Sequence, residues 1–124
     1  MDFKECPCSG KSLIRLVRPA ILGVLAQGPL HGYLIIQQLE KLSFFQNQSP
    51  DPTGIYRSLK SMEEEGLLVS KWDAVQSGPA RRLFTLTEDG RDCLNRWFKT
   101  LGVYRKDIDN MIAFLTKTQR KGRR

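Results

Sequence analysis

Several features that mark particular classes of protein are absent from this chain of 124 residues. No apolar run reaches the roughly 18 residues that can cross a bilayer, and Leu13–Ala26, which comes closest, is interrupted by Arg15, Arg18 and Pro19. Residues 1–10 have no basic region leading into an apolar one, so they do not resemble a signal peptide. The sequence therefore predicts a cytoplasmic protein with no membrane partner.

Cysteine and histidine are scarce. The chain has three cysteines, Cys6, Cys8 and Cys93, and one histidine, His31. An odd number of cysteines gives no disulfide framework, and Cys93 has no base partner near it in the sequence. The chain also has no glycine-rich phosphate loop and no convincing carboxylate pair. These absences argue against an enzyme and predict neither a cofactor nor a structural zinc site.

The N-terminal Cys6-Pro7-Cys8 sequence leaves one alternative open. Two chains together would supply four thiolates, which suit a soft metal or a redox sensor. No histidine lies nearby to complete a zinc-finger pattern, and inert thiols on a mobile N-terminus are the other interpretation. A thiol- or metal-responsive regulator is therefore kept as an alternative function.

Basic residues outnumber acidic ones, and the formal net charge is +7. This balance favours an anionic partner such as nucleic acid. However, five of the positive charges lie in the tail at residues 116–124, and the basic and acidic residues of 51–87 cancel. A winged-helix module that binds protein rather than DNA therefore stays open as a second alternative.

Glycine and proline divide the chain into a series of expected elements. Three helices are predicted in the first part: Lys11–Gln27, either kinked or divided at Pro19, Gly32–Leu42, and a third that ends at about Glu65. Asp51 is expected to cap the third helix, with Pro52 at its first position.

A β-hairpin and a long helix are expected next. Leu67–Val75 and Arg82–Thr87 are rich in strand formers and flank the Ser77-Gly78-Pro79 turn. Thr87 is expected to cap the last helix. The order predicts a mainly α fold with a small β-hairpin, a winged helix-turn-helix over residues 11–87, after a flexible segment at 1–10.

The expected C-terminal helix, residues 88–116, carries the clearest periodic pattern. Its apolar residues alternate in spacing between three and four, as in an a/d heptad seam: Leu94, Trp97, Leu101, Tyr104, Ile108, Met111 and Leu115. The helix is too long to bury this stripe on so small a domain, although packing along its own core is the alternative. We therefore expect a homodimer, followed by a basic tail at 117–124.

The outward face of the third helix holds the candidate DNA contacts. A helical wheel turns Ile55, Leu59 and Met62 toward the core. The polar residues fall on the opposite face or its flank: Thr53, Tyr56, Arg57, Lys60, Ser61 and Glu64. In a winged helix-turn-helix this helix enters the major groove, where arginine and lysine donate to guanine or phosphate. Arg81 and Arg82 beside the hairpin turn are expected to contact phosphate.

Three blocks of sequence resemble a known family. They are LAQGPLHGY at 25–33, GIYRSLKSMEEEGLL at 54–68 and SGPARRLFTLTEDG at 77–90. In order, they resemble the junction of the first two helices, the recognition helix with the first wing strand, and the wing tip of PadR-type transcriptional regulators. The resemblance covers residues 13–115. It implies a repressor that dimerises through its last helix, binds promoter palindromes and is released by small molecules.

The resemblance also implies roles for individual residues. Tyr56, Arg57 and Lys60 would contact DNA from the third helix, and Gly32 and Tyr33 would shape the start of the second helix, where backbone N–H groups can meet a phosphate. The full set of predicted DNA-binding residues is Gly32, Tyr33, Thr53, Gly54, Tyr56, Arg57, Lys60, Arg81 and Arg82. The proline-rich Asp51-Pro52-Thr53-Gly54 sequence departs from the family's usual form and would alter how the recognition helix is aimed.

A small-molecule site is expected near the dimer seam. Trp97, Leu101 and Tyr104 are large side chains that can line an apolar pocket for a small aromatic or hydrophobic effector. Aromatic residues at heptad positions are more often plain core, and that interpretation stays open.

Overall fold

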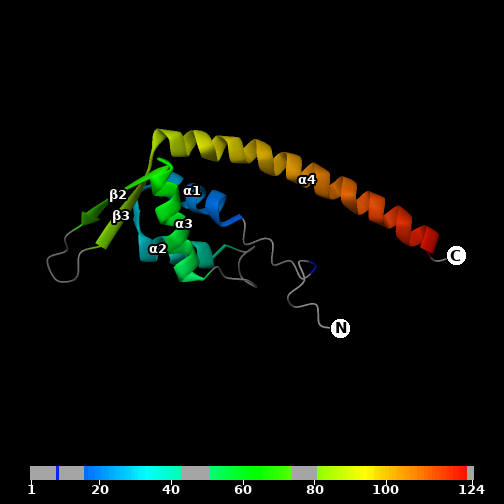
Figure 1. The fold of residues 1–124 in the computed structure, drawn as a ribbon, viewed down its shortest axis with the longest axis horizontal. Coiled ribbons are helices and arrows are strands. Elements are labelled where there is room, and N and C mark those ends of the chain that lie inside the picture. The colour runs from blue at the N-terminus through cyan, green and yellow to red at the C-terminus, as the bar shows by residue number, and fades with distance from the viewer. Residues whose placement is uncertain (1–7, 9–15, 43–50, 74–80, 123–124) are drawn as a thin grey trace. The chain divides into compact units, whose positions relative to one another are not determined.

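The computed structural model describes residues 8, 16–42, 51–73 and 81–122, apart from the side chain of Lys121. The predictions for residues 1–7, the helix at 11–15, the loop at 43–50 and the Ser77-Gly78-Pro79 turn lie outside the described residues. The chain divides into two units, Met1–Leu94 and Asn95–Arg124, which are described separately. Figure 1 shows the elements of each unit.

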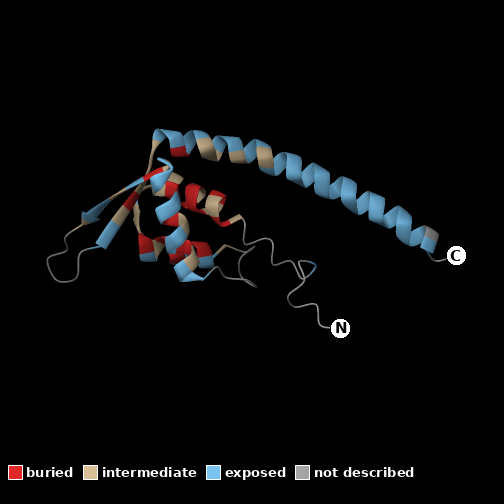
Figure 2. Cartoon of the chain, viewed as in Figure 1, coloured by how far each residue is buried: buried red, intermediate tan, exposed pale blue. Residues whose placement is uncertain are grey.

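Three helices form most of the core of the first unit: α1 (Val17–Ala26), α2 (Gly32–Glu40) and α3 (Pro52–Glu64). The described part of α1 is one helix that continues through Pro19. Pro19 lies in the first turn, where the missing N–H has no intrahelical partner to lose. Buried residues gather where the three helices meet (Figure 2). The core residues exposed by no more than 2% are Ile21, Leu22, Leu25, Ile35, Leu39, Ile55, Leu59, Met62 and Leu68.

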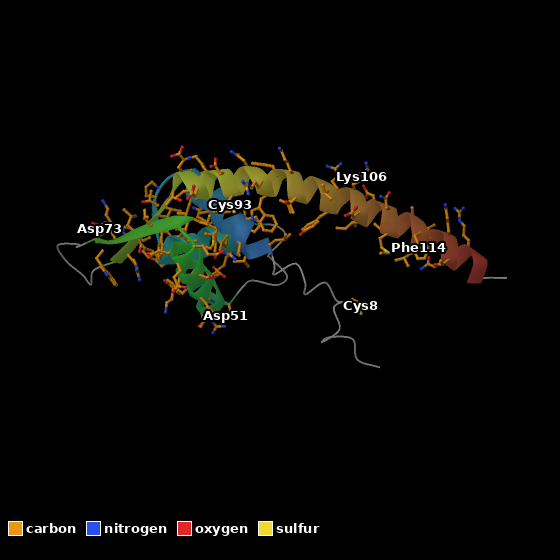
Figure 3. The ribbon with its side chains drawn as sticks, turned by 45° about the horizontal axis from the view of Figure 1, so that its top comes forward. Cys8, Asp51, Asp73, Cys93, Lys106 and Phe114 are labelled. Carbon is orange, nitrogen blue, oxygen red and sulfur yellow. The ribbon has the colours of Figure 1, made fainter. Side chains whose placement is uncertain are left out.

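The predicted cap of α3 is wrong. Asp51 lies at the start of α3 (Figure 3); its backbone is extended, but its side chain makes no capping hydrogen bond. Only its backbone takes part, since its carbonyl accepts from the Ile55 N–H at 3.0 Å. Asp51 is exposed, so water can satisfy its carboxylate and the first N–H groups. Pro52 in the first turn has no N–H to satisfy and fixes a helical φ.

The sheet has three antiparallel strands in the order β1-β3-β2, with β1 at Leu30–His31, β2 at Leu68–Asp73 and β3 at Arg81–Leu86. The predicted hairpin of β2 and β3 is confirmed. The sequence pattern does not predict β1, because two residues are too short to show a strand period. Leu30 pairs with Phe84 and His31 with Leu83. Since α2 begins at the next residue, this pairing attaches the start of α2 to the hairpin.

Thr87 organises the junction between the hairpin and α4 (Glu88–Gly122). Its hydroxyl accepts a hydrogen bond from the Gly90 N–H at 3.0 Å, so the predicted cap is present. The same hydroxyl donates to the Gly66 carbonyl at 2.7 Å, and the Thr87 N–H donates to Leu67 O at 3.1 Å. A Cβ on Gly90 would lie 2.2 Å from Leu67 O, so only glycine fits at this contact.

The second unit is the rest of α4. The helix continues to Gly122, so residues 117–122 of the expected tail are helical. The seam residues Leu101, Tyr104, Ile108, Met111 and Leu115 are 37–58% exposed in the single chain. Along the described helices, no stretch is both long and apolar enough for a membrane span.

We predict that Gly90→Ala destabilises the protein, because the new Cβ collides with the backbone oxygen of Leu67. The expected loss is about 1–3 kcal/mol in the free energy of unfolding. Gly102→Ala on the same helix is the matched control, since nothing lies within 4 Å of its Cβ. The control should gain about 0.5–1 kcal/mol from helix propensity. Denaturant unfolding followed by circular dichroism measures both, and equal effects would contradict the account.

Candidate nucleic-acid interface

The outward face of α3 carries two basic side chains that have no local partner among the described residues. Ile55, Leu59 and Met62 are at most 1% exposed, as predicted, and this burial turns Tyr56, Arg57 and Lys60 to solvent. Within the part of the chain that the structure describes, no side chain forms a hydrogen bond or ion pair with Arg57 or Lys60. Thr53 at the start of the helix is also exposed. The helix therefore presents free donors from its first three turns.

Three of the five acidic residues that cancel this charge in the sequence have side-chain partners in the described structure. Glu65 at the end of α3 forms an ion pair with Arg18 of α1. Glu63 bonds Ser70 and Arg82. Asp73, which lies at the far end of β2 (Figure 3), accepts from Nε2 of His31 at 3.2 Å. Of these partners, Arg18 and His31 lie outside residues 51–87. Arg18 therefore adds one positive charge beside α3 that the net charge of residues 51–87 does not include, while Glu64 on α3 has no partner among the described residues.

Gly32 allows α2 and α3 to approach closely. A Cβ at Gly32 would lie 2.7 Å from Cε1 of Tyr56 and 3.2 Å from its hydroxyl oxygen. The Tyr56 ring therefore rests against the first residue of α2, where backbone N–H groups are unpaired. Tyr33, the next residue, is 41% exposed. The structure thus brings together Gly32, Tyr33 and Tyr56, which the sequence predicts as DNA-binding residues.

The two arginines of the hairpin have different surroundings. Arg81 donates from Nη1 to the Tyr33 hydroxyl at 2.8 Å, with its guanidinium carbon 5.0 Å from the centre of that ring. Arg82 donates from Nε to Ser70 Oγ at 2.7 Å, and its Nη2 lies 3.3 Å from both carboxylate oxygens of Glu63. Arg81 is therefore bonded to a neutral group, whereas Arg82 is bonded to a carboxylate.

These side chains surround a groove of about 740 Å³ between the start of α2, α3 and the hairpin. Its lining residues are His31, Gly32, Tyr33, Tyr56, Lys60, Glu63, Glu64, Trp72, Arg81, Arg82 and Phe84. Trp72, which is 68% exposed, is missing from the sequence prediction. Its strand alternation with Ser70 indicates a shared face, and the hydrogen bond from Ser70 to Glu63 shows that this face meets α3.

The other candidate sites are not part of this groove. The predicted effector residues lie in the second unit, where Leu101 and Tyr104 are exposed and Trp97 is half-buried. The alternative thiol site includes Cys6, which lies outside the described residues, while Cys8 is exposed. Over the ranges that the structure covers, no cluster of three or more histidine, cysteine or acidic residues is placed to hold a metal ion.

Comparisons with known proteins agree with this geometry. Residues 21–96 match the Transcriptional regulator PadR-like family. The negative transcriptional regulator PadR of Bacillus subtilis (strain 168) is 32% identical over 85 residues, which make up 68% of this chain and 46% of that protein. The chain thus spans about half the length of this relative.

Two crystal structures have similar folds. B. subtilis PadR in complex with operator DNA superposes with a TM-score of 0.61 at 29% identity, over 68% of this chain and 48% of that one. A PadR family regulator from hypervirulent Clostridium difficile R20291 superposes with a TM-score of 0.68 at 24% identity. That likeness covers 78% of this chain and 98% of the other, so the fold extends over nearly all of the smaller protein.

We predict that Gly32→Ala moves the Tyr56 ring. The new Cβ overlaps the far end of an exposed side chain, so the ring can swing away and the stability should change by less than about 1 kcal/mol. NMR of tyrosine-labelled protein should show a shifted Tyr56 ring signal. Gly23→Ala on α1 is the control, because nothing lies within 4 Å of its Cβ. An unmoved Tyr56 signal in Gly32→Ala would contradict the close approach.

Proposed function

Because the chain belongs to the PadR-like family of transcriptional regulators, we propose that it binds double-stranded promoter DNA as a homodimer and represses transcription in the cytoplasm. The observation that carries this proposal is the outward face of α3, where Arg57 and Lys60 have no partner among the described residues. A solvated helix face needs no such groove beside it, whereas here Tyr33, Tyr56 and Arg81 line one. The family match points the same way.

In the proposed complex, α3 enters the major groove, which is wide enough for one helix. Arg57 and Lys60 donate to guanine edges or phosphates, and Thr53 and Tyr56 donate to phosphates. The start of α2 at Gly32 places unpaired N–H groups and the positive end of a helix dipole toward the backbone. Phosphate contacts fix the protein on the duplex, and contacts to base edges read the sequence.

The proposed dimer forms through α4. In the single chain the seam residues from Leu101 to Leu115 are exposed, and a stripe of this size on a helix surface calls for a partner. A second copy offers the same stripe, and two-fold symmetry makes that contact self-complementary. A dimer presents two copies of α3, which suits a palindromic operator.

Release by a small molecule stays a prediction from the family resemblance. Trp97 and Tyr104 occupy d positions of the heptad pattern and Leu101 an a position. In a dimer these positions from both chains face one another, so the aromatic rings would line any apolar pocket at the seam.

A genomic selection followed by fluorescence anisotropy tests the proposed function. Fragments enriched by the protein are titrated against scrambled duplexes at several salt concentrations. Tighter binding to the selected fragment, with steep salt dependence on both, is the expected result because phosphate contacts release counterions. Equal, salt-insensitive binding to both duplexes would contradict it and would favour the protein-binding winged helix instead.

We predict that Arg57→Ala weakens binding to the selected fragment by about 1–3 kcal/mol, the range for loss of one base contact. Arg57 is exposed and unpaired in the described structure, so the melting temperature should stay close to that of the wild type. Lys99→Ala, at an f position of α4, removes one positive charge outside α3 and should leave affinity nearly unchanged. Equal losses of affinity in Arg57→Ala and Lys99→Ala would show an effect of net charge alone and would contradict a specific contact by Arg57.

We predict that Leu101→Asp gives a monomer, because a carboxylate at an a position would be buried without a partner in the seam. Val103→Asp is the control, since Val103 is 57% exposed but occupies a c position outside the seam. Multi-angle light scattering should give the monomer mass for Leu101→Asp and the dimer mass for the control. A dimer mass for both variants would contradict the proposal that the seam is the dimer interface.

A further inference from the structure

The neighbouring arginines of β3 both count as phosphate contacts in the sequence prediction, yet their surroundings differ. We infer that Arg82 is a positioning residue, which fixes the hairpin against α3 through Glu63, and that Arg81 is the phosphate contact of the pair. This inference rests on the proposed DNA-binding function and divides two roles that the sequence does not distinguish.

The network around Arg82 joins three elements. Arg82 on β3 donates from Nε to Ser70 Oγ on β2 at 2.7 Å and reaches both carboxylate oxygens of Glu63 on α3 at 3.3 Å. Ser70 Oγ in turn donates to Glu63 Oε2 at 2.9 Å. Each of the three residues therefore contacts the other two, and the hairpin is tied to α3 by both of its strands.

A phosphate would compete with these contacts for Arg82, whose side chain is 50% exposed and whose Nη1 has no partner among the described residues. The Nε and Nη2 donors are taken, and the guanidinium also lies over the rings of Trp72 at 5.7 Å and Phe84 at 6.0 Å. The carboxylate of Glu63 beside it would repel an incoming phosphate. The Glu63 side chain is only 25% exposed, so releasing Arg82 would leave a partly desolvated carboxylate without its cation.

Arg81 faces no such obstacle. Its bonded partner is the neutral hydroxyl of Tyr33, so no carboxylate among the described residues is bonded to its positive charge. The acid nearest in register is Asp73, which pairs directly across the strands from Arg81. That carboxylate is hydrogen bonded to His31 at 3.2 Å, and no ion pair joins it to Arg81 among the described residues. The Arg81 side chain is thus available for an anion.

The position of the hairpin matters because α3 and the hairpin must meet DNA together. A two-stranded hairpin is only marginally stable alone, so its direction depends on what it packs against. Side chains alternate along a strand, so the register puts Ser70, Trp72, Arg82 and Phe84 on one face, and the contacts of Ser70 and Arg82 with Glu63 turn that face toward α3. Loss of the Arg82 network would leave the phosphate contacts intact but would let the hairpin change its angle.

Salt dependence separates the two roles, with Arg81→Ala and Arg82→Ala as matched variants. Each removes one arginine from the same strand. Arg81→Ala should lower the salt slope on the selected fragment by about 0.9 for each protomer bound. Arg82→Ala should keep the wild-type slope while binding the fragment about fivefold more weakly, as expected for loss of a partly exposed ion pair. Equal losses of slope would overturn the inference.

Glu63→Gln tests the Arg82 network without removing either arginine. It therefore tests the positioning role of Arg82 even if Arg82→Ala does not fold. Freed from its carboxylate, Arg82 should reach phosphate, so the slope on scrambled duplex should steepen by up to about 0.9 per protomer. Preference for the selected fragment should fall at the same time. Wild-type slope and preference in Glu63→Gln would overturn the positioning role.

The two possible failures are distinguishable. Wild-type protein that enriches no fragment and shows no steep salt dependence would overturn the proposed function, and this inference with it. Wild-type protein that binds as proposed, while Arg81→Ala and Arg82→Ala lose equal slope, would overturn the inference alone.

Discussion

Burial of Ile55, Leu59 and Met62 fixes the rotation of α3 about its own axis, and the proposed interface depends on that rotation. All three side chains are at most 1% exposed against the helices of the first unit. Turning the helix to hide Arg57 or Lys60 would expose this stripe at about 1.5–3 kcal/mol for each side chain. The polar face of α3 is therefore held toward solvent by the hydrophobic core and needs no polar contacts of its own.

The remaining parts of the interface are placed by close approaches to this fixed helix. Gly32 lets the start of α2 touch the Tyr56 ring, and the pairing of β1 with β3 attaches the same turn to the hairpin. The hairpin base is tied to α4 where the Thr87 hydroxyl bonds Gly66 O and the Gly90 N–H. Together these contacts bring α2, α3 and β3 around one groove, which a helix face alone would not provide.

Periodic patterns explain what the sequence could predict and what it could not. The inward stripe of α3, the β2–β3 hairpin and the Thr87 cap follow from local spacing and residue type, and the structure has all three. The β1 strand, the position of Trp72 and the Glu63–Arg82 contact depend on register and on residues distant in sequence. Asp51 is a case where the sequence predicts a contact that is missing, since its residue type suits a helix cap but its side chain makes no capping hydrogen bond. The helix also passes residue 116, and residues 117–121 contain no glycine or proline that would end it there.

Hydroxyl-radical footprinting of a selected genomic fragment tests the central claim most directly, because it shows where the protein lies on the DNA backbone. The account predicts two protected patches related by two-fold symmetry, with centres about 10–10.5 base pairs apart or at a multiple of that spacing. Such a pattern follows from two copies of α3 in one dimer. A single asymmetric patch, or uniform cleavage along a fragment that the protein binds, would contradict the account.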